Sequence, residues 1–335
     1  MIRFAAPTPP LTSSRLAGGL AACALLAVAL LGGCSRADTD ATLRLGTNVW
    51  PGYEPLFLAR KQGYWSDGQI RLVEYPSATE VLRAFRNRSI EAASLTLDEV
   101  MRLREDDIPV QVVLVHDISA GADVVLARPG IGGMADLRGR RVGVESSALG
   151  AFMLTRALEL SGLRLDEIET LSVDINGHER AYLSGAVDAV VTFEPVRTRL
   201  LNAGAREIFT SRELPNEIVD VLVVHERFAR RHPERVQLLV DAWFQALALM
   251  EQDRNSAAHV FAERLKTTPG EVLASFEGLR LPSRAENLAL LGGEQAALQA
   301  TAEHLGRVMS AARLLRAPLE ARSLFNSAFV QGAAP

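Results

Sequence analysis

The chain has 335 residues, 48% of them hydrophobic and 23% charged, and its formal net charge at pH 7 is −4. This length and composition are typical of a globular protein with one large domain or two medium-sized ones. The acidic balance argues against nucleic acid or an anionic membrane surface as the main partner.

The first 33 residues have the order of a secretory signal peptide. Arg3 and Arg15 precede an uncharged run over residues 16–33, and a polar segment follows it. The end of the run, Leu31-Gly32-Gly33-Cys34, resembles the lipobox of bacterial lipoproteins, which implies cleavage before Cys34 and a lipid on its sulfur. The alternative is a single transmembrane helix, since about 18 apolar residues lie at the lower limit for spanning a bilayer.

Cleavage before Cys34 would leave residues 34–41 as a polar tether. The chain has two cysteines, and Cys23 lies inside the run that would be removed. We therefore expect a mature protein whose only cysteine is lipidated, with none left for a disulfide, a metal site or nucleophilic catalysis. Loss of Arg3 and Arg15 with the signal would make the mature chain more acidic still.

From residue 42 onward, short apolar runs alternate with helical patterns, as in βαβ units with a mainly parallel sheet. The first unit has predicted strands at 42–49, 69–75, 90–95, 110–117 and 122–128. The second has predicted strands at 141–145, 168–174, 187–193 and 205–210, and helices near 147–161, 177–184 and after Pro195. One more strand is predicted at 219–225, and the chain beyond Glu226 is predicted to be helical.

Two α/β units can form tandem domains or two lobes that exchange segments. The stretch HDISAGADVVLARPG, residues 116–130, favours exchanging lobes, because it joins two strands without a helix, as a hinge crossing requires. The stretch IVDVLVVHE, residues 218–226, would be the return crossing. We predict one lobe from residues 42–120 and 224–330, with the C-terminal helices, and a second from residues 121–223.

Aromatic and polar residues cluster at the carboxyl ends of the predicted strands, where open α/β sheets bind ligands. Two of the segments that follow these strands, SATE at 77–80 and TLDE at 96–99, match the S/T-x-x-E capping box. The predicted ligand-binding residues are Trp50, Tyr53, Glu54, Ser77, Thr96, Asp98, Asp117, Ser119, Ser146, Ser147, Asn176, Thr192 and Glu194. Each of them has a simpler role available, as a helix cap, a core aromatic or a charge on a helix dipole, but their shared position favours a binding cleft.

Three segments in this order resemble the periplasmic solute-binding proteins of ABC importers for nitrate, sulfonates, taurine and pyrimidine precursors of thiamine. They are LGTNVWPGYEPLFLARKQGYW at 45–65, LRGRRVGVESSALGAFMLTRALELSGL at 137–163 and YLSGAVDAVVTFEPV at 182–196. The resemblance covers about residues 42–260. It implies an α/β, type II-like periplasmic-binding-protein fold with two lobes, two crossover strands and here a helical C-terminal tail. It also implies closure on a small solute and delivery to an ABC permease with a cytoplasmic ATPase, by a periplasmic, lipid-anchored protein that we expect to be a monomer.

The predicted strand ends give conflicting signals about the charge of the solute. Helix N-termini near them favour an anion. The same strand ends carry no lysine or arginine but several carboxylates, namely Glu54, Glu80, Asp98, Asp117, Asp123, Glu145, Glu179 and Glu194. A like-charge pair about 4 Å apart costs about 4 kcal/mol even at an effective dielectric constant near 20. We therefore predict a solute with a protonated amine or several N–H donors, such as an aminosulfonate or an aminopyrimidine, rather than nitrate or bicarbonate. We expect it to stack on Trp50 or Tyr53 and to bond to Asp98, Asp117 or Glu194, with any acidic end on the Ser146 and Ser147 amides.

Enzymatic functions are disfavoured by the residues available. The chain lacks the G-x-S-x-G elbow of serine hydrolases, and its six histidines have no metal-binding spacing. The branch of the family that makes a thiamine pyrimidine from pyridoxal phosphate needs a Schiff-base lysine, and the only lysines, Lys61 and Lys266, lie on predicted helices. We expect no cofactor and no metal. A ligand-sensing or assembly lipoprotein that uses the same cleft is the alternative to transport.

Overall fold

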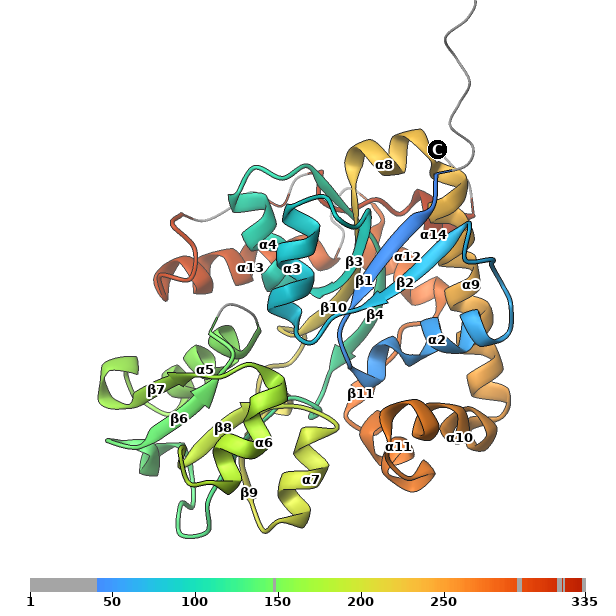
Figure 1. The fold of residues 1–335 in the computed structure, drawn as a ribbon. Coiled ribbons are helices and arrows are strands. Elements are labelled where there is room, and N and C mark those ends of the chain that lie inside the picture. Colours follow the sequence, from blue (N-terminus) through green and yellow to red (C-terminus); the bar gives the residue numbers. More distant parts are fainter. Residues whose placement is uncertain (1–40, 147–148, 294–296, 318–320, 322, 333–335) are drawn as a thin grey trace, which may run out of the picture. The chain divides into compact units, whose positions relative to one another are not determined.

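The computed structural model describes residues 41–146, 149–293, 297–317, 321 and 323–332 (Figure 1). The predicted signal peptide, the lipidation site at Cys34 and nearly all of the tether lie outside these residues. The described chain from Ala41 onward forms one compact unit. None of its described helices is long and apolar enough to cross a membrane.

The strands form two mixed sheets. The first sheet has the order β11-β4-β10-β3-β1-β2 and the second has the order β7-β6-β8-β5-β9. The strands of the first sheet are β1 (Leu43–Thr47), β2 (Ile70–Glu74), β3 (Ala92–Thr96), β4 (Val110–Ser119), β10 (Val219–His225) and β11 (Leu279–Arg280). Those of the second are β5 (Val124–Ala127), β6 (Arg141–Val144), β7 (Glu169–Ser172), β8 (Ala189–Thr192) and β9 (Arg206–Thr210).

In both sheets a parallel part adjoins an antiparallel part. Strand β1 runs parallel to β2 and β3, whereas β10 is antiparallel to both β3 and β4. In the second sheet, β6 is parallel to β7 and β8, whereas β5 is antiparallel to β8 and β9. Strands β3, β4 and β5 are almost entirely buried on both faces, so their sequences do not alternate regularly between apolar and polar residues.

Helices cover both faces of each sheet. The first lobe, built on the first sheet, has α2 (Glu54–Lys61), α3 (Ala78–Arg86) and α4 (Leu97–Glu105), and the second lobe has α5 (Leu149–Leu160), α6 (Ile175–Leu183) and α7 (Val196–Asn202). The C-terminal helices are α8 (Glu226–Arg231), α9 (Pro233–Gln252), α10 (Arg254–Leu265), α11 (Pro269–Phe276), α12 (Arg284–Leu291), α13 (Ala297–Ala311) and α14 (Ala328–Gln331).

The C-terminal helices pack on the first lobe. Helix α9 lies against α2 and α14, α12 lies against β4, and α13 lies against α4 (Figure 1). Pro233 and Pro269 occupy the first positions of α9 and α11, where a missing N–H is tolerated, so these prolines begin helices instead of interrupting them. Strand β11 lies in the segment predicted to be helical throughout, and its two residues are too few to leave a strand pattern in the sequence.

The chain changes sheets twice, between β4 and β5 and again between β9 and β10. The first crossing is residues 120–123, between β4 and β5. The second crossing is residues 211–218, because β10 pairs with β3 and β4 along its length, and the predicted lobe boundary at residue 223 therefore falls inside a strand of the first sheet. The hydroxyl oxygens of Ser119 and Ser211 lie 2.7 Å apart, and the Gly121 N–H donates to Ser211 Oγ at 2.6 Å. The two crossings are thus bonded to each other.

Candidate ligand-binding site

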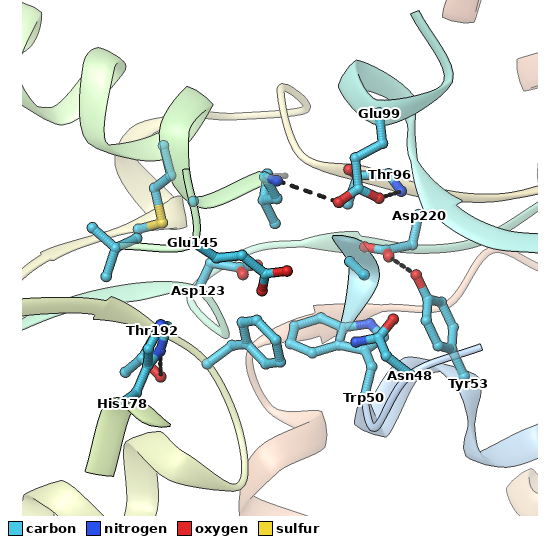
Figure 2. A pocket seen from close by; sticks show the side chains of 16 residues that line it. Asn48, Trp50, Tyr53, Thr96, Glu99, Asp123, Glu145, His178, Thr192 and Asp220 are labelled. Atoms are coloured by element: carbon cyan, nitrogen blue, oxygen red, sulfur yellow. Dashed lines mark hydrogen bonds between the residues drawn. The ribbon is translucent and has the colours of Figure 1, made fainter. Parts of the chain in front are cut away.

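A cavity with about 550 Å³ of empty space, partly open to solvent, lies where the two lobes meet (Figure 2). The first lobe contributes Asn48, Trp50, Tyr53, Ala78, Thr96, Glu99 and Asp220 to its lining. The second lobe contributes Glu145, Leu149, Gly150, Met153, His178, Val191, Thr192 and Phe193, and the first crossing contributes Asp123. The lining therefore comes from both sheets and from the segment that joins them.

Trp50 is fixed by a buried carboxylate behind it. Its Nε1 donates to Asp117 Oδ2 at 3.1 Å, and its ring meets Phe193 of the other lobe edge to face, with centroids 5.3 Å apart. The carboxylate reaches Trp50 by passing close to the backbone of Gly52, where a Cβ atom would lie 1.9 Å from Asp117 Oδ2. A glycine in the turn after β1 is therefore required by packing against the tryptophan and its partner.

Tyr53 and Asp220 form the second aromatic–carboxylate pair. The Tyr53 hydroxyl donates a short hydrogen bond to Asp220 Oδ1. Burial, followed by the neighbouring Asp117, raises the pKa of Asp220 well above its ordinary value. Burial also raises the pKa of Tyr53, with a further contribution from Asp220, so the phenol stays protonated and remains a donor.

Two glutamates of the lining connect the lobes in opposite directions. Glu99, in α4 of the first lobe, accepts hydrogen bonds from the Thr96 N–H at 2.9 Å and from the Leu149 N–H, at the start of α5, at 3.3 Å. Glu145, in the second lobe, accepts from the Thr79 N–H in the first turn of α3 at 3.1 Å, and from the Thr79 hydroxyl. Each lobe thus places a carboxylate at a helix N-terminus of the other, where free amides and the helix dipole favour negative charge.

His178 adds no positive charge to the cavity. Its Nε2 lies 2.9 Å from the Val173 carbonyl oxygen and must donate to it, so Nδ1, 3.2 Å from Thr192 Oγ1, accepts from that hydroxyl. Burial lowers the pKa of His178 to about 4, and the imidazole is therefore neutral at physiological pH.

The cavity is consequently acidic. Four carboxylates line it, those of Glu99, Asp123, Glu145 and Asp220, and none of its lining residues is a lysine or arginine. Burial raises the pKa of Glu99 to about 8 and that of Asp123 to about 7, and it also raises the pKa of Glu145. Within the described part of the chain, no group of three or more His, Cys, Asp and Glu side chains is arranged to hold a metal ion. The site offers hydrogen-bond acceptors and aromatic surface to a ligand.

Four of the residues predicted from the sequence line the cavity: Trp50, Tyr53, Thr96 and Thr192. Asp117 lies behind Trp50, and Asp98 is buried but does not reach the cavity. Ser119 bonds to Ser211 at the crossings, as described above.

The other predicted residues have local roles. Glu54 is bonded to Arg264, and Glu194 pairs with Arg197 at 3.0 Å and accepts from the Thr198 N–H at 3.1 Å. Ser77 caps α3, Ser146 is exposed, and Asn176 Nδ2 donates to the Pro76 carbonyl oxygen at 3.0 Å, which links the lobes outside the cavity. Ser147 lies outside the described residues.

Several lining residues were absent from the predicted set: Asn48, Glu99, Asp123, Glu145, His178, Phe193 and Asp220. The sequence marks Asp123 and Glu145 as acidic residues at strand ends and Glu99 as the last residue of a capping box. These patterns alone do not indicate that the three side chains line the cavity. Asp220 opens β10, whose antiparallel direction brings its first residues, rather than its last, to the cavity edge. The direction of that strand could not be read from its apolar pattern.

Two α/β lobes joined by two crossings, with a cavity between them, define a periplasmic binding protein fold. The structure superposes on the alkanesulfonate-binding protein SsuA from Xanthomonas axonopodis pv. citri bound to MOPS, with a TM-score of 0.70 and 22% identity over 84% of this chain and 96% of that one. It also superposes on a ligand-binding component of an ABC-type import system from Staphylococcus aureus with zinc bound, with a TM-score of 0.73 and 12% identity over 87% and 98% of the chains. The predicted fold class is thereby confirmed.

Residues 36–266 match the NMT1-like family, and the chain belongs to that family. Over 238 residues it is 24% identical to an Escherichia coli K12 protein named for binding aliphatic sulfonates, covering 70% of this chain and 73% of that protein. Over 86 residues it is 32% identical to a protein from Brucella abortus 2308 named only as a binding protein, covering 26% and 27% of the two chains. The resemblance to the sulfonate and nitrate group of binding proteins is confirmed.

One further structural neighbour is an enzyme. The desulfurization enzyme DszB, as a cysteine-to-serine mutant in complex with biphenyl-2-sulfinic acid, superposes with a TM-score of 0.65 and 20% identity, over 87% of this chain and 97% of that one. In the present chain both cysteines, Cys23 and Cys34, precede the described residues, and none of the described residues of the lining is a cysteine.

Proposed function

We propose that the protein is the solute-binding component of an ABC importer, which captures a small amine-bearing solute between its lobes and delivers it to a membrane permease. The family, the two-lobe fold and the relatives named as binding proteins support the transport role. They also agree with the prediction of a binding protein rather than an enzyme. The observation that carries the choice of solute is a cavity lined by four carboxylates and three aromatic rings, with no lysine or arginine.

Binding of a bare anion is opposed by the same geometry. In this chain the Leu149 and Thr79 amides, at the starts of α5 and α3, already donate to Glu99 and Glu145. A sulfonate or nitrate would have to displace these carboxylates while facing Asp123 and Asp220, with no basic residue of the lining to offset the repulsion. An ammonium or amidinium group, in contrast, gains charge-assisted hydrogen bonds with the lining.

The proposal corrects one detail of the sequence-based hypothesis. An acidic end of the solute was expected at the Ser146 and Ser147 amides, but Ser146 is exposed and absent from the lining, and Ser147 is not described. The contacts expected at Asp98, Asp117 and Glu194 are likewise absent from the lining, because these carboxylates are buried behind it or paired elsewhere.

A thermal-shift panel tests the choice of solute. Nitrate, methanesulfonate, isethionate, taurine, benzyl alcohol, benzylamine and 4-aminopyrimidine would each be added to the purified protein. We expect the amine-bearing compounds to raise the melting temperature by mass action, and their matched alcohols, isethionate for taurine and benzyl alcohol for benzylamine, to have no effect. A response to nitrate or methanesulfonate with none to any amine would refute the proposal.

We also propose that the mature protein is held in the periplasm by a lipid on Cys34. Stable attachment to a membrane needs two or more acyl chains, as a diacylglyceryl cysteine with an acylated N-terminus provides. Metabolic labelling with a fatty-acid probe should mark the wild-type protein and leave the Cys34→Ala variant unlabelled, with Cys23→Ala as the matched control that keeps its label. Label retained by Cys34→Ala would refute attachment of the lipid at Cys34.

A further inference from the structure

We propose that the protonated amine of the solute binds at Asp123 and Asp220, on the floor of the cavity where the two crossings meet. The inference rests on the proposed function and makes it specific: the group of the solute that binds at these two carboxylates is a primary ammonium or amidinium.

The carboxylate of Asp123 is a buried acceptor with an unused oxygen. The residue lies in the first crossing, is 2% exposed and lines the cavity. Its Oδ2 has no hydrogen-bond partner among the described residues. Because an unpaired buried carboxylate oxygen is costly, the arrangement indicates a donor that the cavity receives from outside the protein.

Asp220 faces the same cavity from the start of β10, just after the second crossing. It is 3% exposed, and its Oδ1 accepts the Tyr53 hydroxyl. Asp117 of β4 lies opposite it in the strand register. A cation bound by Asp123 and Asp220 would therefore contact the first crossing and the strand that follows the second one, and it would relieve repulsion within a buried acidic group.

The other carboxylates of the lining are already engaged. Glu99 accepts two backbone N–H groups, and Glu145 accepts one N–H and one hydroxyl, in each case bridging the lobes. Among the carboxylates of the described lining, Asp123 Oδ2 is therefore the buried oxygen without a partner; behind the lining, Asp98 and Asp117 also have such oxygens. Tyr53 and Trp50 lie in the same lining as Asp123 and Asp220 (Figure 2). Together with Phe193, which also lines the cavity, they offer aromatic surface for the ammonium and for the body of the solute.

Several titratable groups surround Asp123 and Asp220. Asp98 and Glu99 of α4, Asp117 of β4 and Tyr53 are the titratable groups that interact with Asp123 or Asp220. The guanidinium of Arg212 lies close to Gly121 in the first crossing, but Arg212 is exposed and is not part of the lining. The titratable groups around Asp123 and Asp220 are therefore all acidic, and because burial raises the pKa values of the carboxyl groups, a bound cation would favour their ionised forms.

Binding of benzylamine and of taurine to Asp123→Asn and Asp220→Asn would test the inference, with dissociation constants from isothermal titration calorimetry. Each substitution should raise the dissociation constant about 10- to 100-fold, as expected for the loss of a hydrogen bond to a charged group. Asp98→Asn is the matched control, since it removes a buried negative charge that acts on Asp123 but is not part of the lining. It should change the constant less than about threefold.

Proton release separates contact with the amine from a structural effect. When an ammonium binds a carboxylate that is partly protonated, protons leave the protein, so the calorimetric enthalpy near pH 7 should depend on the ionisation enthalpy of the buffer. We expect this dependence in the wild type and in Asp98→Asn, and a smaller one in Asp123→Asn. Circular dichroism would establish that each variant is folded.

The outcomes distinguish this inference from the proposed function. If the wild type binds an amine, and Asp123→Asn and Asp220→Asn bind it as tightly and release as many protons, the transport proposal stands and the hinge-floor assignment is overturned. If the wild type binds neither amine but binds methanesulfonate or nitrate, the proposed function falls first.

Discussion

Asp117 acts on the cavity through Trp50. Its carboxylate is fully buried, holds the indole N–H, and reaches it only because residue 52 has no side chain. The sequence WPGYE at 50–54 therefore does more than form a turn. Gly52 leaves space for the Asp117 carboxylate of β4, and that carboxylate orients the Trp50 ring, which contacts Phe193.

Replacing Gly52 with alanine should disturb this arrangement. The added Cβ would lie 1.9 Å from Asp117 Oδ2 and 2.5 Å from Trp50 Nε1, so both side chains must shift. We expect Gly52→Ala to lower the free energy of unfolding by about 1–3 kcal/mol, as overpacking does, and to change the tryptophan fluorescence. Gly133→Ala is the control, because its Cβ would meet no atom within 4 Å and its φ of −170° suits any residue. Urea unfolding of both variants measures the difference in their free energies of unfolding. Equal values would show that the turn accommodates a Cβ atom at residue 52 without strain.

The buried acids of the cavity also predict how stability depends on pH. The folded-state pKa of Asp123 is raised to about 7 and that of Glu99 to about 8, both mainly by burial, whereas in the unfolded chain both are near 4. The contribution of these two groups to the free energy of unfolding is therefore fully present below their unfolded pKa. It decreases as the pH rises above that value and is lost once the pH has passed through the folded pKa.

We expect the free energy of unfolding of the ligand-free protein to fall between about pH 4 and about pH 8, by about 1.4 kcal/mol per group for each pH unit between its unfolded and its folded pKa, and to level off above that range. Denaturant titrations across this range measure the slope. Asp123→Asn should make the slope shallower. A stability that rises over this range would mean that these carboxylates are ionised in the folded protein at neutral pH.

Helices α3 and α5 connect the lobes through their N-termini. Each receives a glutamate from the opposite lobe, Glu145 at α3 and Glu99 at α5, so the contacts that join the lobes also form part of the cavity wall. A solute that displaced or neutralised either glutamate would alter the lobe contact at the same time. The affinity of the site and the closure of the lobes are therefore coupled through these two helices.

Glu145→Gln tests that coupling. The glutamine keeps the size of the side chain but removes the charge that interacts with the α3 N-terminus, an interaction worth about 0.3–1 kcal/mol at such positions. We expect bound taurine or benzylamine to dissociate about two- to fivefold faster, measured by stopped-flow fluorescence. The control is Glu80→Gln, which changes a glutamate of the same helix turn that pairs with Arg83 inside the first lobe. Equal dissociation rates for the two variants would place the coupling elsewhere.

The sequence predicted the elements better than the contacts between them. Apolar runs located nearly all the strands, and the carboxyl ends of β1, β3 and β8 supplied Trp50, Thr96 and Thr192 to the cavity. The other side chains are positioned by partners 50 or more residues away in the sequence. Arg264 binds Glu54, which does not line the cavity, and the Thr79 and Leu149 amides bind Glu145 and Glu99. Such pairings depend on how the lobes pack, which periodicity within a segment does not record.

At the scale of the whole molecule, we propose that the two crossings act as one hinge. Residues 120–123 and 211–218 are bonded to each other through Ser119, Gly121 and Ser211, so a movement of one crossing must involve the other. Gly121 has a φ of +124°, which few residues other than glycine adopt, and the crossing can therefore turn sharply before Asp123 enters the cavity. A ligand bound to Asp123 and Asp220 would hold both crossings at once.

Closure of the lobes on the solute should follow from this hinge. The Glu99, Glu145 and Asn176 contacts and the Trp50–Phe193 pair all join the lobes, and all must separate if a solute is to enter from solvent. We expect small-angle X-ray scattering to give a smaller radius of gyration with saturating benzylamine or taurine than without it. At a ligand concentration about 100 times the dissociation constant, binding should also stabilise the protein by about 2.7 kcal/mol. The control is Asp123→Asn, compared with the wild type at a ligand concentration near the wild-type dissociation constant, where its weaker binding should leave it mostly in the more extended state. Tight binding with no compaction would mean that the lobes are held together before the solute arrives, and that the solute enters through the opening of a rigid cavity.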